Sequence, residues 1–421
     1  MDQRIKKFAD SVFEKFGLAE YYLGRTGFYH DSPFQNKTDY TLCMEWFPIG
    51  AAAEGDDSNP EGTAVIEVHI PSGRTRRAIF AGGKTSADGV KFMPGDRGSM
   101  IDWIEKETGL SYGQQFMLTN EKGRRLHFSA AVNGTVIYPG GYIELETDEE
   151  GRLITFSSHG SFPEADQVQA EKYALSLEDI DEDLLREQLI FAQFPNQEKE
   201  KWFSLFAIEE VFITNDRQKT IEFDPIGMEP KLMVDQVIDW DKPSDVPFER
   251  KPIIESEDIG ADQAFGGEPH IESYPIREAE ADKCAAAVRQ VLSREYPNES
   301  GQWILKTLRR TRGCIDAVLR KSGHDSSVFK RKLTVVIDAH SYEPRNYIDN
   351  QMMLDMFDGY QAPGEPAVVK AEAFEKLKSY FFLKPVYVYD AEKEKYVLCG
   401  KLDCRHAVDA VTGKIVLLDD I

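Results

Sequence analysis

The chain has 421 residues, of which 41% are hydrophobic and 11% aromatic, enough to build the cores of two or three domains and too many for a disordered protein. It carries 50 Lys and Arg against 73 Asp and Glu, a net charge of −23, which argues against general binding to nucleic acid or to anionic membranes because both repel an acidic surface. No apolar run reaches the roughly 18 residues that a membrane-spanning helix needs, so we expect no membrane partner.

The first predicted element is an amphipathic helix within residues 1–17. Apolar residues recur there at helical spacing, with charged residues between them: Ile5, Phe8, Ala9, Val12, Phe13 and Phe16. A secretory signal peptide would instead contain an unbroken apolar stretch. The five cysteines are scattered along the chain, as is typical of reduced thiols, so we expect a cytoplasmic protein.

The same order of elements, a helix followed by strands with short turns, recurs along the chain. Strands are predicted within 40–47 and 63–80 after the first helix. The second unit has a helix near 100–109 and strands within 124–158, with a strong turn signal at Asn133-Gly134.

Three further units follow. A helix is predicted to start after Ser176 and to extend to 191, with strands within 202–223. The next helix has Cys284, Val288, Val291 and Leu292 on one face and ends before Pro297. The last unit has a helix within 369–381 and strands up to the C-terminal end of the sequence.

Three predicted hairpins share one pattern: an acidic residue on the first strand, a Gly turn, a basic residue and a second apolar strand. They are "VIEVHIPSGRTRRAIF", "YIELETDEEGRLITF" and "HAVDAVTGKIVLL". These repeats predict an α+β fold of tandem units, each with one helix packed on a small antiparallel sheet, arranged in two halves.

A segment without helix or strand periodicity separates the halves. It holds five prolines and a Gly-Gly pair, and residues 241–282 contain 4 basic and 12 acidic residues. We therefore predict an N-terminal half (1–240), an acidic Pro-rich linker (241–277) and a C-terminal half (278–421).

The stretch "AIFAGGKTSAD" (78–88) resembles a nucleotide-binding loop only superficially. The phosphate-binding pattern requires Gly where Ala78 stands, and it requires a helix from Lys84 that Gly89 and Pro94 would interrupt. We expect a strand that ends in a glycine-rich turn, and no nucleotide cofactor.

"DIDEDLLREQLI" (179–190) begins like a calcium-binding loop. Leu184 stands where that loop needs Gly, and Ile190 stands where it needs Glu. The leucines of this stretch have helical spacing, so a helix with an acidic first turn is the better interpretation.

A thiol-based metal or redox module remains an alternative at Cys399, Cys404 and His406. In an unbroken strand Cys404 and His406 share one face, and a bulge at Gly400 would be needed to bring Cys399 to them. Half-buried structural thiols are the simpler interpretation.

One segment has a net positive charge, opposite to that of the whole chain. Residues 303–332 hold 9 basic and 2 acidic residues. They are either solvated faces of strands and helices or a docking surface for an acidic partner, in which Arg309, Arg310 and Arg312 would bind.

The hairpin pattern resembles the PepSY-like repeat proteins of Gram-positive bacteria, most closely the YcdB/YcdC-type repeated domain. "LHFSAAVNGTVIYPGGYIELETDEEGRLITF" is similar to that domain, and so are "VVKAEAFEKLKSYFFLKPVYVYD" and the closing "HAVDAVTGKIVLLDD". The resemblance implies a cystatin-like α+β fold, modules that in related propeptides bind and restrain peptidases, and no catalytic residues.

We therefore expect a non-enzymatic intracellular binding or regulatory protein with a protein or peptide partner and no cofactor or metal. The sequence has neither a Gly-x-Ser-x-Gly elbow nor a His-Glu-x-x-His motif. A hydrolase whose site is assembled from dispersed residues between the two halves remains the second alternative, because many catalytic sites have no local signature.

Overall fold

Strands outweigh helices in this protein, at 40% against 22%. The computed structural model describes residues 1–34, 37–51, 59–217, 219–222, 231–244, 246–253, 259–323, 326–390 and 392–421. The strands form sheets of 13, 4 and 5 strands. The predicted α+β fold of tandem units with small antiparallel sheets is therefore wrong. Most strands join one continuous sheet, which pairs edges that small separate sheets would leave open.

The large sheet begins at β1 and ends at β13, and it draws on both ends of the chain. In sheet order its strands are β1 (Tyr21–Phe34), β2 (Lys37–Pro48), β3 (Ala64–His69), β4 (Thr75–Phe80), β9 (Leu153–His159), β8 (Tyr142–Thr147), β6 (Arg125–Val132), β7 (Thr135–Tyr138), β19 (Phe382–Asp390), β20 (Lys395–Asp403), β12 (Val211–Thr214) and β13 (Thr220–Glu222), while β5 (Phe116–Lys122) pairs with β6. β7 and β19 are parallel and join the C-terminal strands to the N-terminal ones.

The two smaller sheets are antiparallel. One contains β10 (Leu189–Asn196), β11 (Lys201–Ile208), β21 (His406–Asp409) and β22 (Ile415–Leu417). The other contains β14 (Leu232–Ile238), β15 (Trp303–Thr311), β16 (Cys314–Lys321), β17 (Lys332–Asp338) and β18 (Pro344–Asp349).

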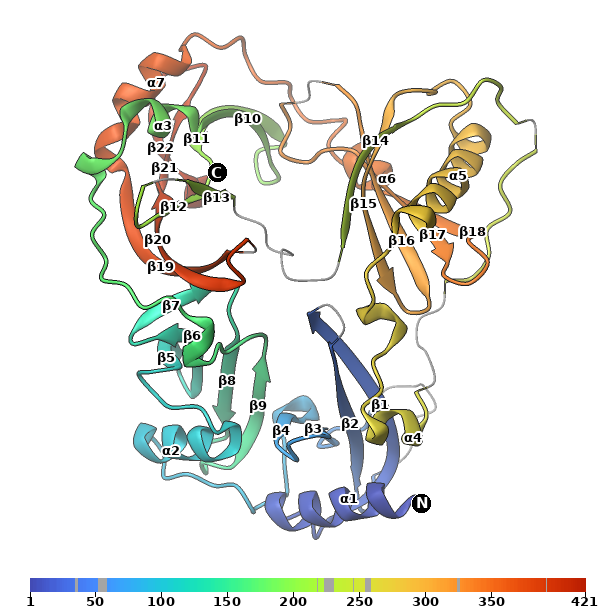
Figure 1. Ribbon diagram of the computed structural model, residues 1–421. Coiled ribbons are helices and arrows are strands. Elements are labelled where there is room, and N and C mark those ends of the chain that lie inside the picture. Colours follow the sequence, from blue (N-terminus) through green and yellow to red (C-terminus); the bar gives the residue numbers. More distant parts are fainter. Residues whose placement is uncertain are drawn as a thin grey trace.

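The longer helices lie toward the outside of the molecule, and the sheets lie toward its middle (Figure 1). The helices are α1 (Gln3–Phe16), α2 (Arg97–Thr108), α3 (Glu182–Glu187), α4 (Ala261–Gly266), α5 (Glu278–Glu295), α6 (Gln351–Asp355) and α7 (Lys370–Leu377). None of the described helices is both long enough and apolar enough to cross a bilayer.

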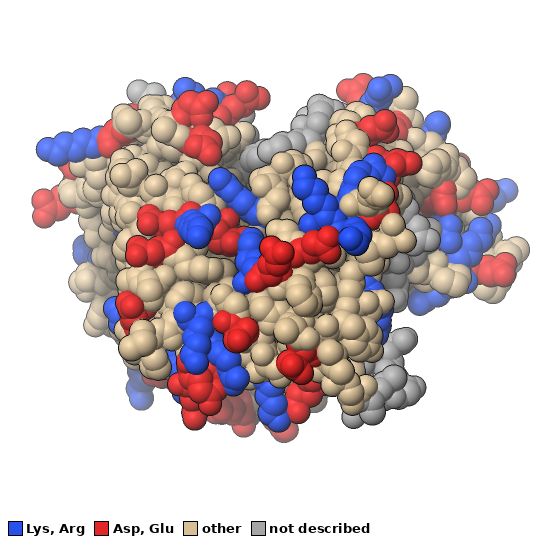
Figure 2. Space-filling view, turned by 90° about the horizontal axis from the view of Figure 1, so that it is seen from below, with Lys and Arg blue, Asp and Glu red and all other residues tan. Residues whose placement is uncertain are grey.

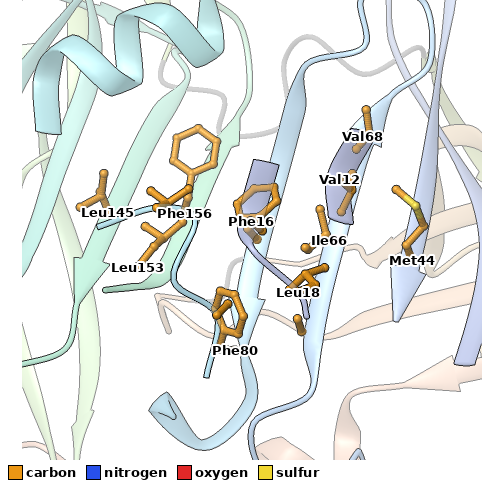
Figure 3. Packing of buried hydrophobic residues seen from close by; sticks show 14 of the residues in the cluster. Val12, Phe16, Leu18, Met44, Ile66, Val68, Phe80, Leu145, Leu153 and Phe156 are labelled. Atoms are coloured by element: carbon orange, nitrogen blue, oxygen red, sulfur yellow. The ribbon is translucent and has the colours of Figure 1, made fainter. Parts of the chain in front are cut away.

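The N-terminal helix is confirmed as α1. Asp2 caps its start by accepting a hydrogen bond from the Arg4 backbone N–H, and Gly17 ends it in the left-handed conformation at φ 65°. Val12 and Phe16 point from α1 into a core formed with the large sheet (Figure 3). The opposite face of the helix carries the charged residues, as its sequence period requires.

Strand β2 shows how the sheet faces are divided. Leu42, Met44 and Trp46 are buried in the core beneath α1, whereas Cys43 and Glu45 alternate with them and point to the other face. The sheet therefore has a face covered by α1 and α2 and a second face, which we call the open face.

The third predicted helix is shorter than expected. One turn of 3-10 helix (Leu177–Asp179) precedes α3, and the chain from Leu189 forms β10 instead of helix. β10 pairs with β11 over its full length, so sheet hydrogen bonding overrides the helical spacing of the leucines.

Sheet pairing crosses the predicted division at 241–277. β14 precedes residue 241 but pairs with β15, and β20 from the C-terminal half pairs with β12 from the N-terminal half. The linker contains α4 and a turn of 3-10 helix, η4 (Ile271–Ser273). Whether 1–240 and 278–421 fold as separate halves stays a prediction.

Candidate functional site

The open face of the large sheet carries one uninterrupted row of mostly polar residues. Cα partners on neighbouring strands follow one another from β1 to β5, and such partners point to the same face. This polar row consists of Gly27, Cys43, Glu67, Arg77, Ser157, Glu144, His127 and Asn120.

Charged residues of this face are paired across the strands. Arg77 donates from Nη1 to Glu67 Oε1 at 3.1 Å and from Nη2 to His159 Nε2 at 3.0 Å. A guanidinium can only donate, so His159 Nε2 is the acceptor and the ring is neutral. Arg25 pairs with Glu45, and Arg125 pairs with Glu144. The face therefore offers hydrogen-bonding groups with little net charge.

Partial burial shifts the pKa values of several groups on this face. It raises the pKa of Glu67 against the opposing effect of Arg77. It lowers the pKa of His159, and Arg77 and Arg76 lower it further. Burial, with the nearby Glu67 and Glu45, raises the pKa of Cys43 to about 12, so this thiol stays protonated at neutral pH.

The polar row reaches the end of the sheet at β1. In the described part of the chain, β1 pairs with β2 alone, and β1 is the first strand in the order of the large sheet. A Cβ added at Gly27 would meet no atom within 4 Å, and the Tyr29 side chain is 56% exposed. β1 thus combines an edge, an open position and an exposed aromatic ring.

A cavity of about 500 Å³ lies elsewhere, between the start of α2 and the hairpin of β5 and β6. Its charged lining residues pair with one another or with neighbours: Arg97 with Glu121, and Arg124 with Glu149. Asp148 is held by Arg152 at 2.7 Å. These groups are engaged in structural pairs, so we rank this cavity below the open face.

The three arginines predicted to bind a partner do not form one exposed surface. Arg310 has a side chain only 7% exposed and donates to Glu280 of α5 at 2.5 Å. Arg309 lies 3.8 Å from Asp316, and Arg312 is exposed in the turn between β15 and β16. Partner binding by these residues stays a prediction, in which Arg312 has the freest access to solvent.

Charges alternate on the face that carries α1 and α2. Figure 2 shows acidic and basic side chains interspersed there, with no broad area of one sign among the coloured residues. This distribution suits a solvated surface.

Cys399, Cys404 and His406 are not brought together as a site. Cys399 and Cys404 are 0% and 5% exposed and belong to different hydrophobic clusters. Burial raises the pKa of Cys399 to about 12 and also raises that of Cys404. Cys404 donates to the His406 carbonyl at 3.3 Å, and the His406 ring packs on Tyr380. Protonated buried thiols are poor nucleophiles.

The glycine-rich turn after β4 is confirmed. Gly82 and Gly83 have φ of 69° and 68°, and Lys84 is extended instead of starting a helix. Its ammonium group pairs with Glu61 at 2.9 Å. In the stretch resembling a calcium loop, Asp181 instead caps α3 by accepting from the Asp183 N–H.

Sequence reasoning did not identify the polar row, although one signal for it was present. The acid-turn-base pattern of the first hairpin places Glu67 and Arg77 on neighbouring strands, where they become direct partners. The remaining members come from hairpins far apart in sequence, so their alignment depends on strand order.

In comparisons with known proteins, no family model, curated protein or solved structure matches the chain.

Proposed function

We propose that this protein is a non-enzymatic intracellular binding or regulatory protein that takes up an extended polypeptide as an added strand along β1. The observation that carries the proposal is that the 14-residue strand β1 ends the large sheet next to the polar row. An edge strand presents backbone N–H and C=O groups that an extended peptide can pair with.

The side chains of β1 favour such a ligand. Gly27 leaves room beside the backbone, and Tyr22 and Tyr29 are 52% and 56% exposed. Exposed tyrosines supply large contact areas at low cost in conformational entropy. Backbone hydrogen bonds would give affinity, and contacts between alternate side chains of the peptide and the open face would give specificity.

The electrostatics of the open face also favour a polypeptide over a strongly charged ligand. Glu67 and Glu45 are each paired with an arginine, and the His159 ring is neutral. A paired face repels neither sign of charge and offers hydrogen bonds to neutral amides.

The test is binding of selected peptides to an edge-blocked variant. A displayed library of random peptides is panned against the purified chain, and the enriched sequence is labelled and titrated by fluorescence anisotropy. We expect Gly27→Lys to weaken binding by about tenfold or more, because a lysine on an edge strand opposes further pairing. The open space at Gly27 allows this side chain without a clash.

Gly359→Lys is the matched control. A Cβ at Gly359 also meets nothing within 4 Å, and this residue lies outside the sheets. We expect unchanged affinity for this variant, and bound peptide should slow amide exchange in residues 21–31. Equal affinity of wild type and Gly27→Lys, or a library without enriched sequences, would refute the proposal.

A further inference from the structure

Two histidines and a glutamate from distant parts of the chain meet beside β1, on the side opposite to the polar row. His30 lies on β1, His270 precedes η4, and Glu272 lies within it. One ligand atom from each residue lies within 4.8 Å of the other two, and His30 Nε2 is 3.7 Å from Glu272 Oε2. The rings of His30 and His270 stack with centroids 3.8 Å apart.

Hydrogen bonds to neighbouring elements hold the segment that carries His270 and Glu272. The Tyr40 hydroxyl of β2 donates to the Glu268 carbonyl at 2.8 Å, and the His270 N–H donates to Thr38 Oγ1 at 2.8 Å. Ser273 is fully buried and donates from its hydroxyl to the His270 carbonyl. The backbone that carries His270 and Glu272 is therefore held against β2 by these hydrogen bonds.

We propose that His30, His270 and Glu272 bind a zinc ion. Two imidazoles and one carboxylate are a donor set that Zn²⁺ accepts with a water molecule as fourth ligand. Ligands about 2.1 Å from a tetrahedral ion lie about 3.4 Å apart, so the three donors, which lie within 4.8 Å of one another, would have to move closer by up to about 1.4 Å. Imidazole nitrogen favours zinc over Mg²⁺ or Ca²⁺, which prefer oxygen.

Burial makes these three donors different from surface acids. The side chains of His30 and Glu272 are each 13% exposed, and His270 is 5% exposed. A net charge of −23 also favours uptake of a cation. His270 Nδ1 accepts a long hydrogen bond, 3.3 Å, from the Glu272 N–H. Zinc at Nε2 requires the ring proton on Nδ1, so this long hydrogen bond is lost when the ion binds.

The ion would connect three parts of the fold. His30 belongs to the first strand of the large sheet, and His270 and Glu272 belong to the segment that leads into α5. Glu272 Oε1 also accepts from the Gly313 N–H, in the turn between β15 and β16 of the five-stranded sheet. Bound zinc should therefore stabilise this junction against thermal unfolding.

Zinc binding to the full chain tests the proposal. After treatment with EDTA and its removal, the chain is titrated with ZnCl₂ by calorimetry and melted with and without zinc. We expect one zinc per chain and a higher Tm with zinc. His270→Gln and Glu272→Gln should each abolish the stoichiometric binding and the rise in Tm, whereas His340→Gln, an exposed histidine outside the cluster, should retain both.

Cobalt spectroscopy keeps the test independent of variant folding. Co²⁺ in the wild-type site should give the visible absorption bands of a four-coordinate ion, which added zinc abolishes. Absence of stoichiometric zinc binding by the wild type would refute the proposal. Binding that survives in both folded variants would refute it as well.

Discussion

At the residue scale, Arg310 and Glu280 show how one buried ion pair connects a helix to a sheet. Glu280 accepts hydrogen bonds from Arg310 of β15 and from the Tyr342 hydroxyl, at 2.5 and 2.6 Å, and from the Arg277 N–H at the start of α5. Reversing Arg310 to Glu would place two carboxylates together at low exposure. A charge reversal meant to probe partner binding should therefore change exposed Arg312 and leave Arg310 in place.

This pair predicts a defined pH dependence. Burial would raise the pKa of Glu280, but the hydrogen bonds from Tyr342, the Arg277 N–H and Arg310 outweigh it and lower the pKa to about 2. A lowered pKa in the folded state stabilises the fold above the ordinary value of 4.5, and that stabilisation is lost as pH falls toward 2. We expect Glu280→Gln to reduce the free energy of unfolding by about 2–3 kcal/mol at pH 7 and by about 1 kcal/mol at pH 3.

Urea unfolding of wild type and variant at both pH values measures this difference. Glu278→Gln is the control, because Glu278 lies in the same first turn of α5 but is exposed. Its effect should stay within about 0.5 kcal/mol at either pH. A pH-independent deficit for Glu280→Gln would contradict the linkage and indicate a packing role instead.

At the element scale, the end of α1 depends on contact between two glycines. Gly17 closes the helix, and the Gly89 N–H donates to the Phe16 carbonyl at 3.1 Å. A Cβ at Gly89 would lie 2.5 Å from the Gly17 nitrogen and the Lys15 carbonyl oxygen. Both atoms are backbone, so they cannot move aside as a flexible side chain would.

We therefore expect Gly89→Ala to destabilise the protein by about 1–3 kcal/mol, the usual cost of overpacking. Gly98→Ala is the matched control near the start of α2, where the closest atom to the new Cβ is an Asp96 side-chain oxygen at 3.4 Å. Alanine in a helix should raise stability there by about 0.5–1 kcal/mol. Urea unfolding at neutral pH measures both changes, and equal stability of the two variants would show that the α1 end can shift.

Local sequence patterns predicted the elements that are determined by neighbouring residues, such as amphipathic helices and tight turns. The helical spacing of Ile5, Val12 and Phe16 predicted α1, and Asn133-Gly134 forms the turn between β6 and β7 with both residues at positive φ. β1 was missed, because "YYLGRTGFYHDSPF" has glycines and charges where alternation would signal a strand. Pairing with β2 and packing of Phe28 against the core stabilise β1, although its own sequence lacks the alternation of a strand.

At the scale of the whole molecule, the arrangement depends on pairings between distant segments. Tyr387 of β19 pairs with Ile137 of β7, and β20 pairs with β12. Strand order of this kind is decided by which edges meet after collapse, and no local period encodes it. The polar row and the cluster of His30, His270 and Glu272 escaped prediction for the same reason, since both form only when distant segments align.

The five-stranded sheet includes β14, which precedes the predicted boundary at residue 241, so this sheet offers a test of that boundary. The buried residues of its core lie between Ile238 and Tyr347 in the sequence, and several of them belong to α5. Ile238 is fully buried on β14, and β14 pairs with β15, so a fragment that begins at the predicted linker loses both.

A fragment of residues 231–351 should melt cooperatively, because it keeps this core and all five strands. A fragment of residues 241–351 should melt at a lower temperature or lack a cooperative transition, because β15 then becomes an unprotected edge beside an opened core. Circular dichroism melting of the two fragments decides the boundary. Equal melting temperatures would place it at residue 241 and make β14 an accessory strand, and failure of both fragments would show that the rest of the chain is needed to hold this sheet.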